Sequence, residues 1–175
     1  MKPLNLSQPH LIITVGIPGS GKSTFADQFA NTFNAPLISL DKLPANSRTA
    51  NDTTLKYFMS EVFKTGRTVV LDTDTRTKNS RVDIAKFATS HGYQPLFVWI
   101  QIDEATAKRR FIKPIIGKNS NTVEHFTQLL AKFTKPNANE KAIVISGKHT
   151  YPSQLKIVLK HLVSDRTTIN EAPRR

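Results

Sequence analysis

The sequence contains no cysteine and no long apolar run, and both absences restrict what it can be. Without cysteine in its 175 residues, the chain has no disulfide bond, no thiolate metal site and no cysteine nucleophile. Its five histidines are scattered, and no two stand three or four positions apart as a metal-binding pair on a helix would. No apolar stretch approaches the roughly 18 residues of a membrane span. The stretch 11–15 is too short for a secretory signal, so we expect a cytoplasmic protein without membrane contact.

Acidic residues are scarce, with 13 Asp and Glu against 25 Lys and Arg, which gives a net charge of +12. This excess favours polyanionic partners such as nucleotides or nucleic acid, although positive charge can also serve solubility alone. The length and the apolar content of 38% fit one globular domain over residues 1–175. We expect residues 1–10 and 165–175 to be flexible, and nothing indicates the oligomeric state.

Short apolar runs alternate with helical stripes along the chain. The runs, which predict buried strands, are residues 11–15, 36–40, 68–71, 96–102 and 142–145. Apolar residues at helical spacing fall within 25–33, 55–63, 84–88, 104–112, 123–133 and 155–162. Strands that alternate with helices predict an α/β fold, in which a parallel sheet is covered on both faces.

The segment 16–23 reads GIPGSGKS and matches G-x-x-x-x-G-K-[ST], the P-loop pattern. Glycines allow positive φ, so that successive N–H groups and the following helix N-terminus can surround a phosphate. Lys22 can reach the β- and γ-phosphates, and the Ser23 hydroxyl can bind Mg²⁺. The alternative is a glycine-rich turn without a ligand. The residues expected to bind ATP are Gly16, Pro18, Gly19, Ser20, Gly21, Lys22, Ser23 and Thr24.

Three aspartates follow predicted strands, at the sheet edge where ligands bind in such folds. Asp41 follows the second strand and can accept a proton from an acceptor hydroxyl. Asp72 ends the third strand and can hold magnesium beside Ser23, a role for which Asp74 competes. Each acid could instead cap a helix or start a turn.

Basic residues cluster near a predicted helix end. Lys108, Arg109, Arg110, Lys113 and Lys118 occur in a stretch without an acid, and Arg109 and Arg110 precede irregular chain. This arrangement predicts a basic lid over about residues 108–121, in which the guanidinium groups neutralise charge on the transferred phosphate. The alternative is cations that only complement the helix C-terminus.

Arg48, Arg76 and Arg81 are further candidates for binding an acceptor phosphate, or else isolated surface arginines. The sequence alone leaves both interpretations open.

The segment 16–24, GIPGSGKST, resembles the loop of polynucleotide 5′-hydroxyl kinases, which typically reads G-x-P-G-S-G-K-S-T. The similarity extends more loosely over about residues 10–135. It implies a P-loop three-layer fold with five parallel strands in the order 2-3-1-4-5, and ATP and Mg²⁺ as cofactors. It also implies that Asp41 activates the acceptor hydroxyl and that Lys108, Arg109 and Arg110 belong to the lid. The family usually carries an arginine three residues after that aspartate, where this sequence has Pro44.

These features predict an ATP-dependent kinase in which Lys22, Asp41, Arg109 and Arg110 are catalytic and Ser23 and Asp72 bind the metal. The expected acceptor is the 5′-hydroxyl of a nucleic acid or nucleoside, with a small molecule as the alternative. The net charge favours nucleic acid among these, whereas Pro44 disfavours it. Two other classes stay open: a nucleotide-binding ATPase module without an acceptor, and a basic nucleic-acid-binding domain with a vestigial P-loop.

Overall fold

The structure, a computed structural model, describes residues 4, 6–42, 52–112 and 122–170, with the backbone alone at 41, 122 and 164–170. Five parallel strands form one sheet in the order β2-β3-β1-β4-β5, which confirms the predicted fold and strand order. The strands are β1 (His10–Val15), β2 (Leu37–Ser39), β3 (Val69–Asp72), β4 (Gln94–Gln101) and β5 (Ile143–Ser146). The helices are α1 (Lys22–Phe33), α2 (Asp52–Phe63), α3 (Lys78–Ser90), α4 (Glu104–Ile112), α5 (Thr122–Ala131) and α6 (Tyr151–Asn170).

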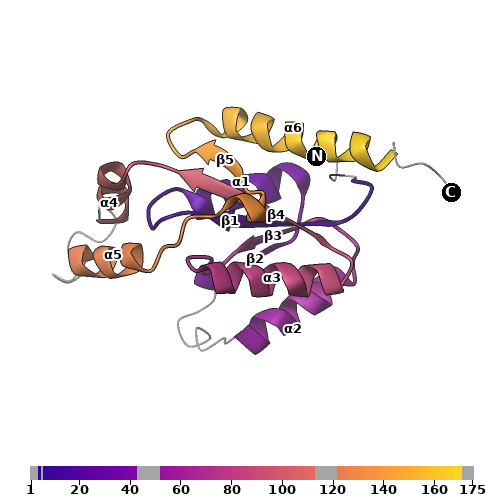
Figure 1. Cartoon of the computed structure of the whole chain (residues 1–175), viewed down its shortest axis with the longest axis horizontal. Helices are drawn as coiled ribbons and strands as arrows, with labels where there is room; N and C mark the ends of the chain where they lie inside the picture. Colours follow the sequence, from indigo (N-terminus) through magenta and orange to yellow (C-terminus); the bar gives the residue numbers. More distant parts are fainter. Residues whose placement is uncertain (1–3, 5, 43–51, 113–121, 171–175) are drawn as a thin grey trace.

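The sheet separates two apolar cores because side chains alternate along each strand. Every residue of β1 is buried, so this central strand contributes to both cores. Ile12 packs with α1 and α6, whereas Leu11 and Ile13 pack with α2 and α3 on the opposite face. Figure 1 shows these two helix layers above and below the sheet. Helices α4 and α5 lie side by side beyond the β4 arrowhead. The C-terminal end of α6 is at the opposite end of the molecule.

Some element ends differ from the prediction. Strand β2 stops at Ser39, and the chain continues as a short 3₁₀-helix, η1 (Leu40–Lys42). Helix α5 ends at Ala131 because the Thr134 N–H donates to the Arg76 carbonyl at 2.8 Å, which draws the chain off the helix axis. Helix α6 continues to Asn170, beyond the predicted 155–162 stripe, since no glycine or proline interrupts that stretch.

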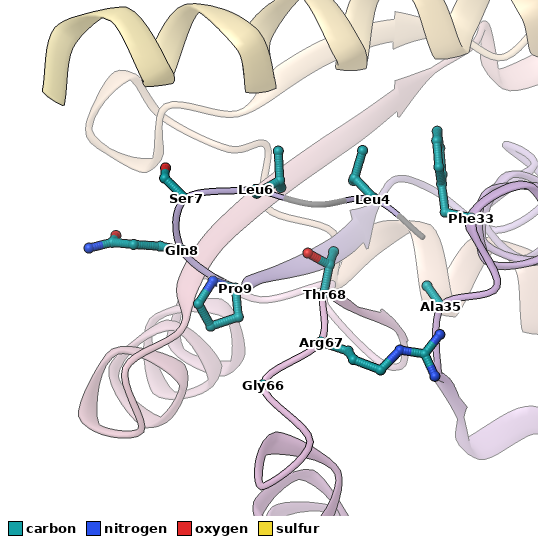
Figure 2. Close-up of a pocket in the computed structure, with 10 residues that line it drawn as sticks. All are labelled: Leu4, Leu6, Ser7, Gln8, Pro9, Phe33, Ala35, Gly66, Arg67 and Thr68. Atoms are coloured by element: carbon teal, nitrogen blue, oxygen red, sulfur yellow. The ribbon is translucent and has the colours of Figure 1, made fainter. Parts of the chain in front are cut away.

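The described residues before β1, which are residue 4 and residues 6–9 and are here termed the N-terminal arm, lie at the end of the sheet opposite the P-loop. A cavity of about 250 Å³ opens there, lined by the arm, the end of α1 and the segment before β3 (Figure 2). Leu4 and Leu6 pack on the core that lies between the sheet and helices α1 and α6. The Arg67 guanidinium donates to the Asn34 carbonyl. None of the predicted site residues lines this cavity.

Among the described residues, no helix is both long and apolar enough to span a lipid bilayer.

Candidate nucleotide-binding site

The glycine loop leaves buried strand β1 and enters α1 in the conformation that the P-loop pattern requires. Gly19 and Gly21 have φ values of 75° and 103°, which other residues rarely adopt. Gly21 is the N-cap of α1 and has no side chain to bond the N–H groups of the first turn. Those N–H groups and the helix dipole favour an anion at this position. The Lys22 ammonium lies back over the loop and donates to the carbonyls of Gly16 and Ile17, both at 3.0 Å.

The loop is held between two other parts of the chain that approach it closely. A Cβ atom on Gly19 would lie 2.2 Å from the carbonyl oxygen of Ala107 in α4. A Cβ atom on Gly147, directly after β5, would lie 2.5 Å from the carbonyl oxygen of Ser20. The Arg110 guanidinium also donates to the Gly147 carbonyl at 2.8 Å, which connects α4 to the β5–α6 loop. Only glycine permits this close approach at 19 and 147.

One cavity, here termed the α6-side cavity, has a volume of about 550 Å³. The Gln154 amide in its wall donates to the Ser146 carbonyl at 2.8 Å. The Tyr151 hydroxyl lies 2.7 Å from that of Thr32, and burial raises the pKa of Tyr151 although this hydrogen bond opposes the rise. The cavity is lined by Gly19, Ser20, Gly21, Lys22, Ser23, Thr24, Phe25, Gln28, Arg110, Gly147, His149, Tyr151 and Gln154.

A second cavity of about 420 Å³, the acid-side cavity, lies on the other side of the loop. Buried Asp72 accepts a hydrogen bond from Thr14 at 2.9 Å. Asp74 pairs with Arg76, whose hydrogen bonds lower the pKa of Asp74, with a smaller contribution from the charge of Lys22. The cavity is lined by Pro18, Gly19, Lys22, Ser23, Asp72, Thr73, Asp74, Thr75, Arg76, Phe111 and Leu129.

The two cavities share Gly19, Lys22 and Ser23. Each volume falls within the range of about 300–1,000 Å³ that is typical of ligand pockets. A polyphosphate that lies along the shared residues would therefore contact both cavities at once, with an acidic wall on one side and a less charged wall on the other.

Comparison with known families supports this geometry. The model of the AAA domain family matches residues 11–136, which include the P-loop, both aspartates of the acid-side cavity and α5. The chain belongs to the AAA domain family. No curated protein matches the sequence.

Several solved structures, among them two kinases, have the same fold as this AAA domain. A gluconokinase from Sinorhizobium meliloti is 16% identical with a TM-score of 0.67, and the match covers 94% of this chain and 98% of that one. The APS kinase CysC from Mycobacterium tuberculosis, in complex with AMPPNP and APS, is 17% identical with a TM-score of 0.67, over 90% and 98% of the two chains. Kti12 from Chaetomium thermophilum, in complex with ADP-AlF3, is 17% identical with a TM-score of 0.62, over 86% and 96%. The AAA domain thus has a P-loop kinase-like fold.

The residues predicted to bind magnesium lie in one cavity. Ser23 and Asp72 both line the acid-side cavity with Lys22. Among the described residues there is no group of three His, Asp or Glu that could hold a metal by itself. This donor set fits Mg²⁺, which usually takes one or two protein oxygens and completes its shell with phosphate and water.

The other predicted catalytic residues differ in how they lie relative to the two cavities. Asp41 lies in η1, two residues after Ser39, which pairs with Asp72 in the sheet register. Its backbone is therefore at the acidic edge, while its side chain lies outside the described part. Arg110 lines the α6-side cavity, whereas exposed Arg109 lines neither cavity. The remaining predicted residues that fall outside the described residues are Pro44, Arg48, Lys113 and Lys118.

Sequence reasoning treated Arg81 as a surface arginine or a phosphate contact, and the structure shows that both are wrong. Arg81 is fully buried and pairs with Glu140. Thr14 and the Gly147 loop, which the sequence also did not lead us to predict, belong to the site as well. The available signals were the polar residue within an apolar strand and the glycine directly after the last strand.

Proposed function

We propose that this AAA domain transfers the γ-phosphate of ATP to the hydroxyl group of an acceptor. The observation that carries the proposal is that two cavities of different character share Gly19, Lys22 and Ser23. Such sharing lets one site hold the donor nucleoside in the α6-side cavity and the acceptor in the acid-side cavity. The kinase-like fold agrees with this assignment.

The nucleotide half of the site would use the loop and its neighbours. Backbone N–H groups of the loop bind the β-phosphate, and the Lys22 ammonium exchanges its two carbonyl partners for phosphate oxygens. Arg110, at the rim of the α6-side cavity, adds positive charge beside the phosphates. Magnesium held by Ser23 and Asp72 would neutralise charge on the β- and γ-phosphates.

The transfer step would use Asp41 as the base. Its carboxylate accepts the proton of the acceptor hydroxyl while the oxygen forms a bond to the γ-phosphorus. The bond between that phosphorus and the β,γ-bridging oxygen breaks, and ADP leaves. Asp41→Asn should reduce transfer sharply and spare ATP binding, as measured by calorimetry beside a turnover assay. Unchanged turnover would remove Asp41 from the mechanism.

We further propose that the acceptor is a nucleoside or nucleic-acid 5′-hydroxyl, with a small-molecule hydroxyl as the second candidate. The net charge of +12 favours polyanionic nucleic acid over an uncharged nucleoside. The kinase-like neighbours include a gluconokinase and an APS kinase, which favour a small molecule.

A panel experiment separates these acceptors. γ-Labelled ATP is incubated with 5′-hydroxyl oligonucleotides, nucleosides and sugars, and the position of the label is determined. Label in oligonucleotides should be accompanied by affinity that falls steeply with salt. Label only in free phosphate would favour an ATPase module, and no consumption of ATP in the presence of magnesium would contradict the kinase proposal. Lys22→Met, which removes the ammonium and preserves much of the side-chain volume, is the inactive control.

A further inference from the structure

The strongest unexplained feature outside the proposed chemistry is a buried arginine that bonds the backbone of two residues in the wall of the acid-side cavity. Arg81, in the first turns of α3, has no exposed surface. Its guanidinium donates two hydrogen bonds to the Glu140 carboxylate, from Nε to Oε1 at 2.5 Å and from Nη2 to Oε2 at 3.2 Å. Burial tends to raise the pKa of Glu140, but the hydrogen bonds from Arg81 and from the Asn137 backbone outweigh it and lower that pKa. The buried pair is therefore charged.

The third nitrogen of Arg81 is directed at backbone rather than at another acid. Nη1 donates to the carbonyls of Thr75 and Thr134, both at 2.9 Å, and to that of Arg76 at 3.3 Å. Thr75 and Arg76 form the loop that carries Asp72 and Asp74, whereas Thr134 follows α5. One side chain thus joins the acid-bearing loop to the chain that leaves α5.

Both joined segments contribute to the wall of the acid-side cavity. The loop supplies Asp72, Asp74 and Arg76, and α5 supplies Leu129. On its other side the loop is attached to the sheet, because the Thr75 hydroxyl donates to the Thr14 carbonyl at 2.8 Å. The hydrogen bonds of Arg81 and the hydrogen bond from Thr75 to Thr14 together fix Asp72 and Asp74 in one position relative to the P-loop.

A buried ion pair is a weak source of stability, because desolvation offsets much of its attraction. Its geometry can nonetheless fix a conformation, and only the planar fork of arginine can bind a carboxylate and three carbonyls together. We propose that Arg81 and Glu140 are positioning residues for phosphoryl transfer, which hold the Asp72–Arg76 loop in register with the P-loop and α5. This inference rests on the proposed kinase function.

Two substitutions test it. Glu140→Gln keeps the shape and removes the charge, and Arg81→Lys keeps the charge and removes the fork. Partners that orient metal ligands typically contribute about 10- to 100-fold to metal affinity or activity. We expect both variants to lose roughly that factor in turnover of γ-labelled ATP. In calorimetry, ATP binds more tightly with Mg²⁺ than with EDTA, and we expect this gain in affinity to shrink in both variants. The affinity for ADP in EDTA should stay within about 2-fold of wild type, because the P-loop is intact.

Tyr93→Phe is the matched control for a merely structural effect. The Tyr93 hydroxyl is buried and donates to the carbonyls of Phe63 and Arg67, at 3.2 and 2.9 Å, at the opposite end of the sheet. This variant also loses side-chain hydrogen bonds to backbone, so it should lower the melting temperature and leave turnover and the magnesium effect unchanged.

The outcomes separate the two proposals. If wild type neither binds nor consumes Mg·ATP, the kinase function fails. If wild type is active and both variants behave like Tyr93→Phe, with lower melting temperature but full turnover and full magnesium effect, the positioning role is refuted. If Arg81→Lys does not fold, the isosteric Glu140→Gln carries the test with the same two results.

Discussion

The close contact between Gly19 and α4 allows a quantitative prediction. In Gly19→Ala, the new Cβ would lie 2.2 Å from the Ala107 carbonyl oxygen and 3.2 Å from the Phe111 backbone nitrogen. Both atoms belong to helix backbone, so the strain can be relieved only if α4 or the loop moves. Because Ala107 is fully buried and Phe111 packs on Phe126 with ring centroids 5.6 Å apart, that movement would disrupt packing between α4 and α5.

The expected cost has two parts. An alanine at left-handed φ costs about 1–2 kcal/mol, partly offset by about 0.4–1 kcal/mol from the less flexible unfolded chain. Overpacking adds about 1–3 kcal/mol. Gly66→Ala is the matched control, because Gly66 has a similar φ of 62° against 75° at Gly19, yet nothing lies within 4 Å of its Cβ position. We therefore expect Gly19→Ala to exceed Gly66→Ala by about 1–3 kcal/mol.

Urea denaturation without nucleotide measures the unfolding free energy of both variants, and calorimetry with Mg·ADP measures their nucleotide affinity. Gly19→Ala should also weaken nucleotide binding, since the loop and α4 cannot both keep their positions, whereas Gly66→Ala should bind like wild type. Equal losses of stability in the two variants, with equal nucleotide affinity, would show that α4 does not lie against the loop as described.

Three smaller predictions follow from other contacts. Thr14→Val keeps the shape but removes the donor to buried Asp72 and should lower the unfolding free energy by about 1–3 kcal/mol in urea denaturation; no loss would contradict that hydrogen bond. The Ser20 hydroxyl is buried without a hydrogen-bond partner among the described residues, so Ser20→Ala removes an unsatisfied polar group and should not lower the unfolding free energy by more than about 0.5 kcal/mol in urea denaturation; a larger loss would show that the hydroxyl has a partner. The lowered pKa of Glu140 means that its carboxylate stabilises the fold at neutral pH, and that this contribution is lost as the pH falls from about 4.3 through the lower folded pKa. The stability difference between wild type and Glu140→Gln should therefore be larger at pH 7 than at pH 3, and a constant difference would refute this.

The sequence by itself determined the local features. The P-loop depends on glycines at fixed spacing and on a following helix, so Gly16–Ser23 could be located from neighbouring residues alone. The strands and their acidic ends could be predicted because fully buried strands are continuously apolar, as in Val69–Asp72. The strand order was confirmed, although it came from the family resemblance rather than from any pattern in the chain.

Only the tertiary structure decided which distant residues meet. Arg81 and Glu140 are 59 positions apart, and an isolated arginine reads the same whether it faces solvent or a buried carboxylate. The close approach of Ala107 to Gly19 and of Gly147 to Ser20 depends on how α4 and the β5–α6 loop close over the P-loop. Such contacts arise from packing between separate elements, which the spacing of residues along the chain does not encode.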